Sequence, residues 1–520
     1  MVSHPTPSCV GPGDSPLNAF RSALAGIRDV RLLTVHALAA AAIFIGLALR
    51  LHFSGFLDPF EDGYQNWWIS SNLLATGQYW DRHSMMTQGN WLPLYHFFAT
   101  AVLWIGGWHN FEAMKVANII LSTLTAVLVF QVGKRQGLSI GLAAVTFFAL
   151  NFVDIVVSGW ATAESLATFL VFLGYAAYFH FDRTKRGNRW IAAAALGFAV
   201  MTRYEAWLAV ALMLLFGLIR LREERRQLLW VVAPGVTIAA AYAIYASQWG
   251  FLPAIVVNQT STDLRYQVSV GTQPSPLTIL ARWWDGYFSF FPVVLLLGGT
   301  YAALRARDDV GSWIVFSLWA FILAYAALRF GNPSYRYVMI SVPFLSLHAA
   351  AGVQRLVRRI LSRPSVGTRS RDRLPAAVVA AVAVLGAGTM LPSAAAFWDS
   401  GFASSQYMVP LQRAGDFVSD LRLPEGKILL SESPIAAYYS GYPPDRILGS
   451  RWLPEDRAEA LSFLKDRVAY IVYMGVPYYK LRALFPELQN GTSTPDFRLL
   501  YDAGGQEIGA HAVYVYGVLS

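Results

Sequence analysis

Long apolar stretches recur along residues 32–394, and most of them approach the length that a helix needs to cross a lipid bilayer. A crossing helix requires roughly 20 predominantly apolar residues, and the first clear stretch runs from Leu32 to Leu51. Only 14% of the residues are charged, whereas a soluble protein carries roughly a quarter. The chain is therefore predicted to be an α-helical polytopic membrane protein.

The positions of Arg and Lys predict the orientation of the chain, because cytoplasmic loops of membrane proteins carry an excess of these residues. Arg21, Arg28 and Arg31 precede the first crossing, and the most basic loop runs from Arg355 to Arg373. The chain is therefore expected to be a multi-pass protein of a bacterial plasma membrane, with its N-terminus in the cytoplasm. The net charge of +9 follows this loop pattern, so no nucleic-acid partner is expected.

The same rule decides how many stretches cross. Counting residues 91–107 as a crossing would place the basic run 182–189 outside, so we assign 91–107 to the outer interface, where Trp91 and Trp104 suit the headgroup region. About 11 crossings then alternate without conflict, at 32–51, 113–132, 137–157, 161–180, 190–202, 206–220, 228–247, 287–304, 311–329, 337–352 and 375–394.

Three parts follow from this division. Residues 1–30 are rich in Pro, Gly and Ser and are predicted to be a disordered cytoplasmic tail. Residues 31–396 form the transmembrane part, whose first outer loop is 52–112, and residues 397–520 form a soluble extracytoplasmic domain. The single cysteine, Cys9, excludes an intrachain disulfide.

The soluble part is predicted to be a small α/β domain. Short apolar strands alternate there with amphipathic helices, and the segments that carry this alternation are 427–430, 435–440, 454–465, 469–473 and 478–488, followed by strand-like segments at 497–500 and 512–516.

Ionisable residues at the edge of a membrane bundle are costly and are therefore candidates for function. Here they fall on the predicted outer side, and they combine both signs of charge. This combination fits an anionic substrate together with a base that removes a proton. The residues are Asp58, Glu61, Asp62, Asp81, Arg82, His83, His96, Glu164, Arg203, Glu205, Asp263, Arg265 and Arg336.

The sharpest local feature is Phe60-Glu61-Asp62-Gly63-Tyr64, directly after the first crossing. A carboxylate at the membrane edge can act as a general base on a hydroxyl or amide acceptor. The alternative is structural: Glu61 and Asp62 are solvated loop charges or cap a helix over 64–75.

With these residues in place, the first outer loop resembles that of the GT-C-type glycosyltransferases, which use polyprenyl- or dolichyl-phosphate sugars. They include protein O-mannosyltransferases, aminoarabinose transferases and, more distantly, the catalytic subunit of oligosaccharyltransferase. The resemblance is carried by Glu61-Asp62, by Gly77-Gln78-Tyr79 and by Pro93-Leu94-Tyr95. It implies a GT-C-like membrane domain and transfer of a sugar, with inversion, to an acceptor at the outer face.

The resemblance also implies roles for individual residues. Asp62 or Glu61 matches the catalytic base, and the order Glu-Asp in place of the usual Asp-Glu leaves open which of the two it is. Glu164 matches a second acidic position, and Arg203-Tyr204 and Arg336-Tyr337 match cationic positions that would hold the lipid phosphate. Further candidates for substrate binding are Asp81, His83 and Arg265.

Several alternatives stay open at this point. Arg203 and Arg336 could be anchors that extend to the headgroups, and Glu164 could only cap its helix. No cofactor is certain, but a divalent cation, Mg or Mn, could bind His83 or His96 together with the nearby aspartates. A transporter or flippase of a lipid-linked glycan and a non-catalytic membrane subunit are the competing functions. The acceptor could be a protein, a lipid or a glycan.

Overall fold

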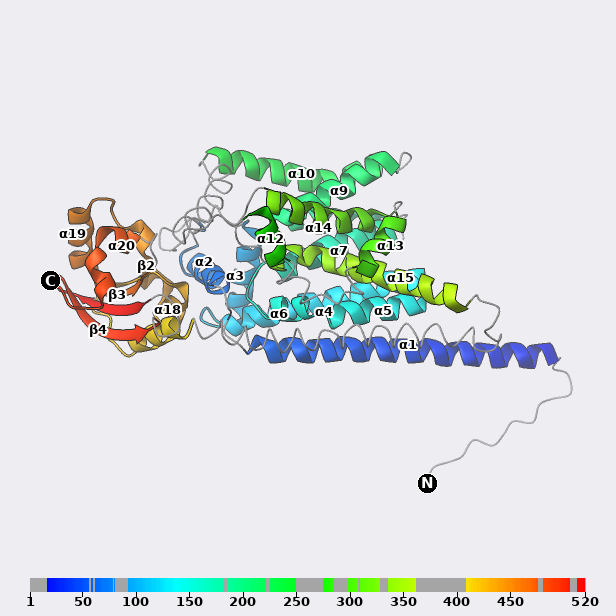
Figure 1. The fold of residues 1–520 in the computed structure, drawn as a ribbon, viewed down its shortest axis with the longest axis horizontal. Helices are drawn as coiled ribbons and strands as arrows, with labels where there is room; N and C mark the ends of the chain where they lie inside the picture. Colours follow the sequence, from blue (N-terminus) through cyan, green and yellow to red (C-terminus); the bar gives the residue numbers. More distant parts are fainter. Residues whose placement is uncertain are drawn as a thin grey trace, which may run out of the picture.

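The structure is a computed structural model in which a bundle of helices carries a small sheet domain at one end, with α2 and α3 between the two (Figure 1). It describes residues 16–55, 58, 61–77, 79, 92–181, 185–220, 225–248, 275–283, 297–306, 309–327, 335–361, 408–475, 480–505 and 512–519. The predicted combination of membrane helices and a C-terminal sheet domain is confirmed.

The bundle and the first outer loop consist of helices of very different length. Their bounds are α1 Pro16–Ser54, α2 Asp62–Thr76, α3 Leu94–Gly106, α4 Phe111–Gln136, α5 Leu138–Ala149, α6 Phe152–Ser158, α7 Glu164–Tyr175, the π-helix η2 Ala176–His180, α8 Arg186–Ala199, α9 Tyr204–Arg220, α10 Arg225–Gln248, α12 Pro276–Trp283, α13 Gly299–Arg305, α14 Val310–Ala327, the 3-10 helix η6 Tyr335–Ser341 and α15 Val342–Leu361.

Helix α1 begins earlier than the sequence analysis expects. Residues 16–30, which were assigned to a disordered tail, are helical. Pro16 is suited to a first helical position, and the Ala- and Leu-containing residues that follow favour helix. Helix α1 therefore replaces the predicted disorder over residues 16–30.

Three helices among the described residues are long and apolar enough to cross a membrane, namely 33–54, 111–136 and 338–359, and a bent pair of helices raises the number to four. The predicted count of about 11 crossings therefore remains a prediction. Helix α3 has 13 residues and so spans about 20 Å, which is short of the roughly 30 Å hydrocarbon core. The assignment of 91–107 to the outer interface remains a prediction.

The bent pair replaces the continuous crossing predicted at 137–157. Helices α5 and α6 meet at an angle of 54°. The side chain of Asn151 accepts a hydrogen bond from the backbone N–H of Asp154 at 3.1 Å and so begins α6 as a new helix. The break therefore has a local cause, a capping residue within an apolar run.

A buried ion pair fastens α1 to this break. Arg50 contacts the carboxylate of Asp154, and both side chains are 1% exposed. Arg50 also donates to the carbonyl oxygen of Ala149 and to the hydroxyl of Ser122, each at 3.0 Å, and Ser122 donates to Asp154 at 2.6 Å. The guanidinium and the carboxylate thus join α1, α4, α5 and α6 in one hydrogen-bonded network.

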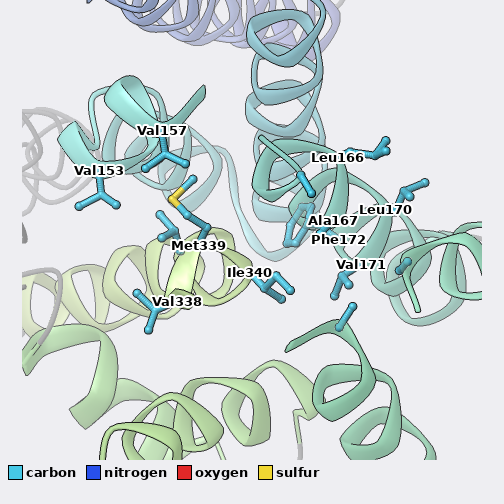
Figure 2. Packing of buried hydrophobic residues seen from close by; sticks show 14 of the residues in the cluster. Val153, Val157, Leu166, Ala167, Leu170, Val171, Phe172, Val338, Met339 and Ile340 are labelled. Atoms are coloured by element: carbon cyan, nitrogen blue, oxygen red, sulfur yellow. The ribbon is translucent and has the colours of Figure 1, made fainter. Parts of the chain in front are cut away.

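The short helix η6 sits between α6 and α7. Figure 2 shows Val338, Met339 and Ile340 of η6 among apolar side chains that include Val153 of α6 and Leu166 of α7. All five side chains are buried. Burial of apolar surface is favourable by roughly 25 cal/mol per Å², so these contacts hold η6 against α6 and α7.

The C-terminal domain, which the sequence predicts to be soluble and which we call the soluble domain, contains a five-stranded mixed sheet of order β2-β1-β3-β5-β4. Strands β2, β1 and β3 are parallel, whereas β5 is antiparallel to both β3 and β4. The elements of the domain are β1 Ile428–Ser431, α18 Pro434–Tyr439, the 3-10 helix η7 Pro444–Arg446, β2 Ile447–Gly449, the 3-10 helix η8 Ser450–Trp452, α19 Arg457–Arg467, β3 Val468–Met474, α20 Lys480–Leu484, the 3-10 helix η9 Pro486–Asn490, β4 Phe497–Gly504 and β5 Val513–Val518.

Aromatic side chains join the soluble domain to the first outer loop. Tyr438 of α18 stacks on His109 with ring centroids 4.4 Å apart, and the Tyr438 hydroxyl donates to the backbone carbonyl oxygen of His109 at 3.2 Å. Trp67 of α2 meets Tyr438 edge-on at 5.0 Å, and Tyr64 stacks on Phe111 at 4.2 Å. Tyr64 and Phe111 each lie 5.5 Å from the ring of Tyr438 as well. Aromatic pairs add about 0.5–1.5 kcal/mol each beyond their buried area, so the pairs that include Tyr438 dock the two parts.

Candidate functional site

The candidate site begins at the first turn of α2, which a buried carboxylate holds in place. The carboxylate of Asp58 accepts a hydrogen bond from the backbone N–H of Ala161 at 3.3 Å and lies 3.7 Å from the ammonium of Lys115. A Cβ atom on Gly63 would lie 2.3 Å from Asp58 Oδ2, so only glycine permits this approach. Burial raises the pKa of Asp58 to about 6, although Lys115 opposes the shift.

Asp62, the first residue of α2, faces an arginine that lies far away in the sequence but close by in space. The Nη1 atom of Arg336 contacts the carboxylate of Asp62, and its Nε atom lies 3.7 Å from Glu164 Oε1. Asp62 is 19% exposed and Arg336 is 11% exposed, whereas Glu164 is almost fully buried. One guanidinium therefore bridges a partly accessible carboxylate and a buried one.

A second arginine completes the cluster. Arg203 donates through Nη1 to Glu164 at 2.6 Å, and it forms a two-pronged contact with Glu205 at 3.0 and 2.7 Å. Glu164 thus lies between two guanidiniums. The cluster of Asp62, Glu164, Arg203, Glu205 and Arg336, which we call the charged cluster, brings together α2, α7, α9 and η6.

These contacts bear on two of the open alternatives. Arg203 and Arg336 lie in ion pairs with buried or half-buried carboxylates, so they are not simple headgroup anchors. Glu164 begins α7, but its carboxylate is held by arginine side chains from other elements. The structure therefore brings together three of the predicted positions, 164, 203 and 336, around Asp62.

Glu61, the other candidate base, has a different environment. Its carboxylate accepts a hydrogen bond from the hydroxyl of Ser433 in the soluble domain at 2.8 Å. Glu61 occupies the N-cap position of α2, without a side-chain capping bond. The two neighbouring acids therefore point to different parts of the molecule, Glu61 to the soluble domain and Asp62 to Arg336.

The remaining predicted residues are described less completely. Tyr204 is half-buried beside Trp207, with ring centroids 5.4 Å apart, and its hydroxyl has no hydrogen-bond partner among the described residues. Tyr337 belongs to η6, but its side chain lies outside the described part of the chain. The predicted site residues Asp81, His83 and Arg265 also lie outside it.

His96 is a structural residue. Its Nε2 atom lies 3.0 Å from Asn66 Oδ1 and its Nδ1 atom lies 2.7 Å from the hydroxyl of Tyr79, so both ring nitrogens have partners. Within the described ranges, no three His, Cys, Asp or Glu side chains are grouped so that they could hold a metal ion. The described carboxylates of the charged cluster are held by arginine, and a divalent cation stays a prediction that depends on Asp81 and His83.

Three polar residues in or near the site were not among the residues predicted from the sequence. Lys115 and Asp154 lie inside predicted crossings, at 113–132 and 137–157, and an ionisable residue within a crossing is a signal in itself. Lys115 supports Asp58, and Asp154 pairs with Arg50. Ser433 carried no comparable signal, because nothing local distinguishes a serine that reaches another domain.

Chemically, the charged cluster offers a carboxylate at a partly open position next to cations. Arginine matches phosphate oxygens with its planar fork of donors, and a carboxylate within reach of a hydroxyl can remove its proton. The arrangement suits a reaction in which a proton is taken from one substrate while a phosphate leaves another.

Comparison with solved structures identifies the fold. ArnT from Cupriavidus metallidurans in the apo state is 15% identical, with a TM-score of 0.53 over 94% of this chain and 98% of that chain. The same protein bound to undecaprenyl phosphate is 16% identical, with a TM-score of 0.50 over 93% and 97%. The archaeal oligosaccharyltransferase AglB from Archaeoglobus fulgidus, in complex with an inhibitory peptide and a dolichol-phosphate, is 11% identical, with a TM-score of 0.52 over 91% and 80%.

No protein-family model matches this chain, and no curated protein is similar to it in sequence. The likeness therefore lies in the fold, and it extends over 98% of the ArnT chain and 80% of the AglB chain. The chain has the fold of the GT-C glycosyltransferases, which confirms the resemblance seen in its first outer loop.

Proposed function

We propose that this protein is a membrane glycosyltransferase that moves a sugar from a polyprenyl-phosphate carrier to an acceptor at the outer face. The observation that carries the proposal is the contact of Arg336 with both Asp62 and Glu164. It joins a carboxylate that can serve as a base to a cation that can bind phosphate. Asp62, the predicted base, and Arg336, the predicted phosphate ligand, lie far apart in the sequence and meet in one cluster.

In the proposed reaction, Asp62 is the general base. Its carboxylate removes the proton of the acceptor, and the acceptor atom attacks the anomeric carbon of the sugar. The bond from this carbon to the phosphate oxygen breaks with inversion, and polyprenyl phosphate leaves with its negative charge. Arg336 and Arg203 stabilise that charge, because preorganised donors in a poorly hydrated site are effective where charge develops.

The ion pair between Arg336 and Asp62 gives the carrier phosphate a further role. A phosphate that binds Arg336 competes with Asp62 for the same guanidinium. Binding of the donor phosphate to Arg336 therefore frees the Asp62 carboxylate from this ion pair, so that Asp62 can act as a base. Glu164 keeps both arginines in position during this exchange, since it contacts both of them.

The solved relatives in fold support the choice of carrier. ArnT binds undecaprenyl phosphate, and the oligosaccharyltransferase AglB binds a dolichol-phosphate and an inhibitory peptide. Undecaprenyl phosphate and dolichol-phosphate are both phosphates of long isoprenoid alcohols. We extend this class of carrier to the present protein, without choosing the sugar or the acceptor.

The test is turnover by purified protein in lipid nanodiscs, offered a panel of polyprenyl-phosphate sugars. Asp62→Asn should lower the release of free polyprenyl phosphate by roughly 10²–10⁴-fold, the usual contribution of a general base. It should bind carrier phosphate at least as tightly as the wild type, because the competitor for Arg336 loses its charge. Glu61→Gln on the neighbouring acid removes the charge but keeps an oxygen that can accept from Ser433, so it should keep most of the activity.

Two outcomes would count against the proposal. If Glu61→Gln collapses turnover and Asp62→Asn does not, the base is Glu61. If the wild type turns over no donor but moves a lipid-linked glycan across the membrane of sealed vesicles, the protein is a flippase. A non-catalytic subunit would do neither.

A further inference from the structure

The loop that follows β1 in the soluble domain is buried and polar. Ser431, Glu432 and Ser433 are each 0% exposed. The hydroxyl of Ser431 donates to the carbonyl oxygen of Ser433 at 2.8 Å and accepts from the backbone N–H of Ser433 at 3.2 Å. The backbone of Ser433 is therefore clamped by a side chain two residues away.

Glu432 fixes the same loop to the two neighbouring strands. One carboxylate oxygen accepts from the backbone N–H of Met474, at the end of β3, at 2.9 Å. The other accepts from the hydroxyl of Ser450, directly after β2, at 3.2 Å. Since β1, β2 and β3 are parallel, Glu432 ties together their carboxyl ends, the edge at which α/β domains commonly place functional groups.

The hydroxyl of Ser433 leaves this clamped loop and reaches the membrane part. It accepts a hydrogen bond from the backbone N–H of Ile435 at 3.2 Å and donates its one proton to Glu61 Oε1 at 2.8 Å. Ser433 is the N-cap of α18 and Glu61 is the N-cap residue of α2. The beginnings of two helices, one from each part of the molecule, are thus joined by a single hydroxyl.

Docking of the two parts does not require this hydrogen bond, because the stacked rings of Tyr438 and His109 and their neighbours already hold the interface. The contact instead falls on the residue before Asp62. The carbonyl oxygen of Glu61 accepts the first hydrogen bond of α2, from the N–H of Gln65 at 2.8 Å. Holding Glu61 therefore holds the turn from which Asp62 projects.

We propose that Ser433 is a positioning residue of the glycosyl transfer. By holding the carboxylate of Glu61, it fixes the first turn of α2 and keeps Asp62 directed at the charged cluster. The soluble domain thereby completes the active site, and Glu61 is its attachment point. This inference rests on the proposed function only for its catalytic readout, since the contact itself can be tested without turnover.

The catalytic test compares Ser433→Ala with Ser433→Thr, which keeps the hydroxyl. Ser433→Ala should lower kcat about tenfold, because an imprecisely held catalytic group loses rate. The KM for the carrier should not rise, since Arg203 and Arg336 are untouched. Ser433→Thr should restore kcat. The matched control is Ser440→Ala at the other end of α18, where the buried hydroxyl donates to Ala437 of its own helix at 2.7 Å.

A second readout separates this inference from the proposed function. Hydrogen exchange at the Gln65 amide reports the first turn of α2 directly. Ser433→Ala should speed this exchange about tenfold, whereas Ser440→Ala should not. Faster exchange in a protein that turns over no donor would support the positioning contact and overturn the glycosyltransferase proposal. Unchanged exchange, or a folded Ser433→Ala protein whose kcat stays within twofold of the wild type, would overturn the role of Ser433.

Discussion

Arg336 of η6 and Asp62 of α2 form an ion pair that joins the last part of the membrane bundle to its first outer loop. The packing of η6 against α6 and α7 carries Arg336 to this position (Figure 2). The geometry of the charged cluster therefore depends on apolar contacts that lie away from the charged groups.

Arg336→Lys should show that the fork of the guanidinium is required. Lysine keeps the charge but offers a single ammonium, which cannot reach Asp62 and Glu164 in the same way. We expect turnover to fall by about 10²-fold, the cost of removing one electrostatic donor from an active site. The control is Arg135→Lys. Arg135 donates to the carbonyl oxygen of His180 at 2.6 Å and lies outside the charged cluster. Equal turnover in wild type and Arg336→Lys would contradict a phosphate-binding role.

The two acids beside Arg203 should differ in their effect on stability. Glu164 is 1% exposed and contacts two arginines, whereas Glu205 is 18% exposed and contacts one. Glu164→Gln removes the buried carboxylate that both guanidiniums contact, while Arg203 keeps Glu205 and Arg336 keeps Asp62. The loss of hydrogen bonds to this charged group should lower the free energy of unfolding by about 1.5–3 kcal/mol. Glu205→Gln should cost about 1 kcal/mol or less. Thermal unfolding of both variants in the same detergent compares them, and equal losses would show that burial does not decide the cost.

The buried pair of Arg50 and Asp154 should behave as a unit. Arg50→Met or Asp154→Leu alone strands one charge among apolar side chains and should cost about 3–5 kcal/mol. The double variant removes both charges and should recover most of that loss. A double-mutant cycle by thermal unfolding measures the coupling, and additive losses would mean that the two side chains do not depend on each other.

Stability of the soluble domain should fall as the pH rises. Burial raises the pKa of Glu432 from its ordinary value of 4.5 to about 8, so the folded domain holds a proton that the unfolded chain has released. The free energy of unfolding therefore decreases between about pH 4.5 and pH 8, and each pKa unit corresponds to ~1.4 kcal/mol.

Glu432→Gln should remove this dependence, because an amide does not ionise. Hydrogen exchange of the β1 and β3 amides at pH 5.5, 7 and 8.5 follows the stability of the sheet after correction for the intrinsic exchange rate. The control is Glu487→Gln, which alters a surface pair with Arg457 and should leave the pH dependence in place. A wild-type sheet whose stability is flat over this range would show that Glu432 is not protonated.

Much of the architecture was predictable from local patterns. The apolar stretches, the basic loops and the short strands of the last 120 or so residues each depend on neighbours in the sequence. The acidic pair after the first crossing was visible in the same way, and so were the candidates Glu164, Arg203 and Arg336. The break between α5 and α6 was missed, because Asn151 lies within an apolar run that satisfies the requirement for a continuous crossing.

The amino-acid sequence by itself determined that long apolar helices and a C-terminal sheet domain form, and which residue types are available for the chemistry. Partition into lipid depends on local apolarity, and orientation depends on local charge. Only the tertiary structure decided that Asp62 faces Arg336 while Glu61 faces Ser433. These pairings depend on the packing of segments hundreds of residues apart, and a hydrogen bond or ion pair forms only when that packing brings two atoms within a few ångströms.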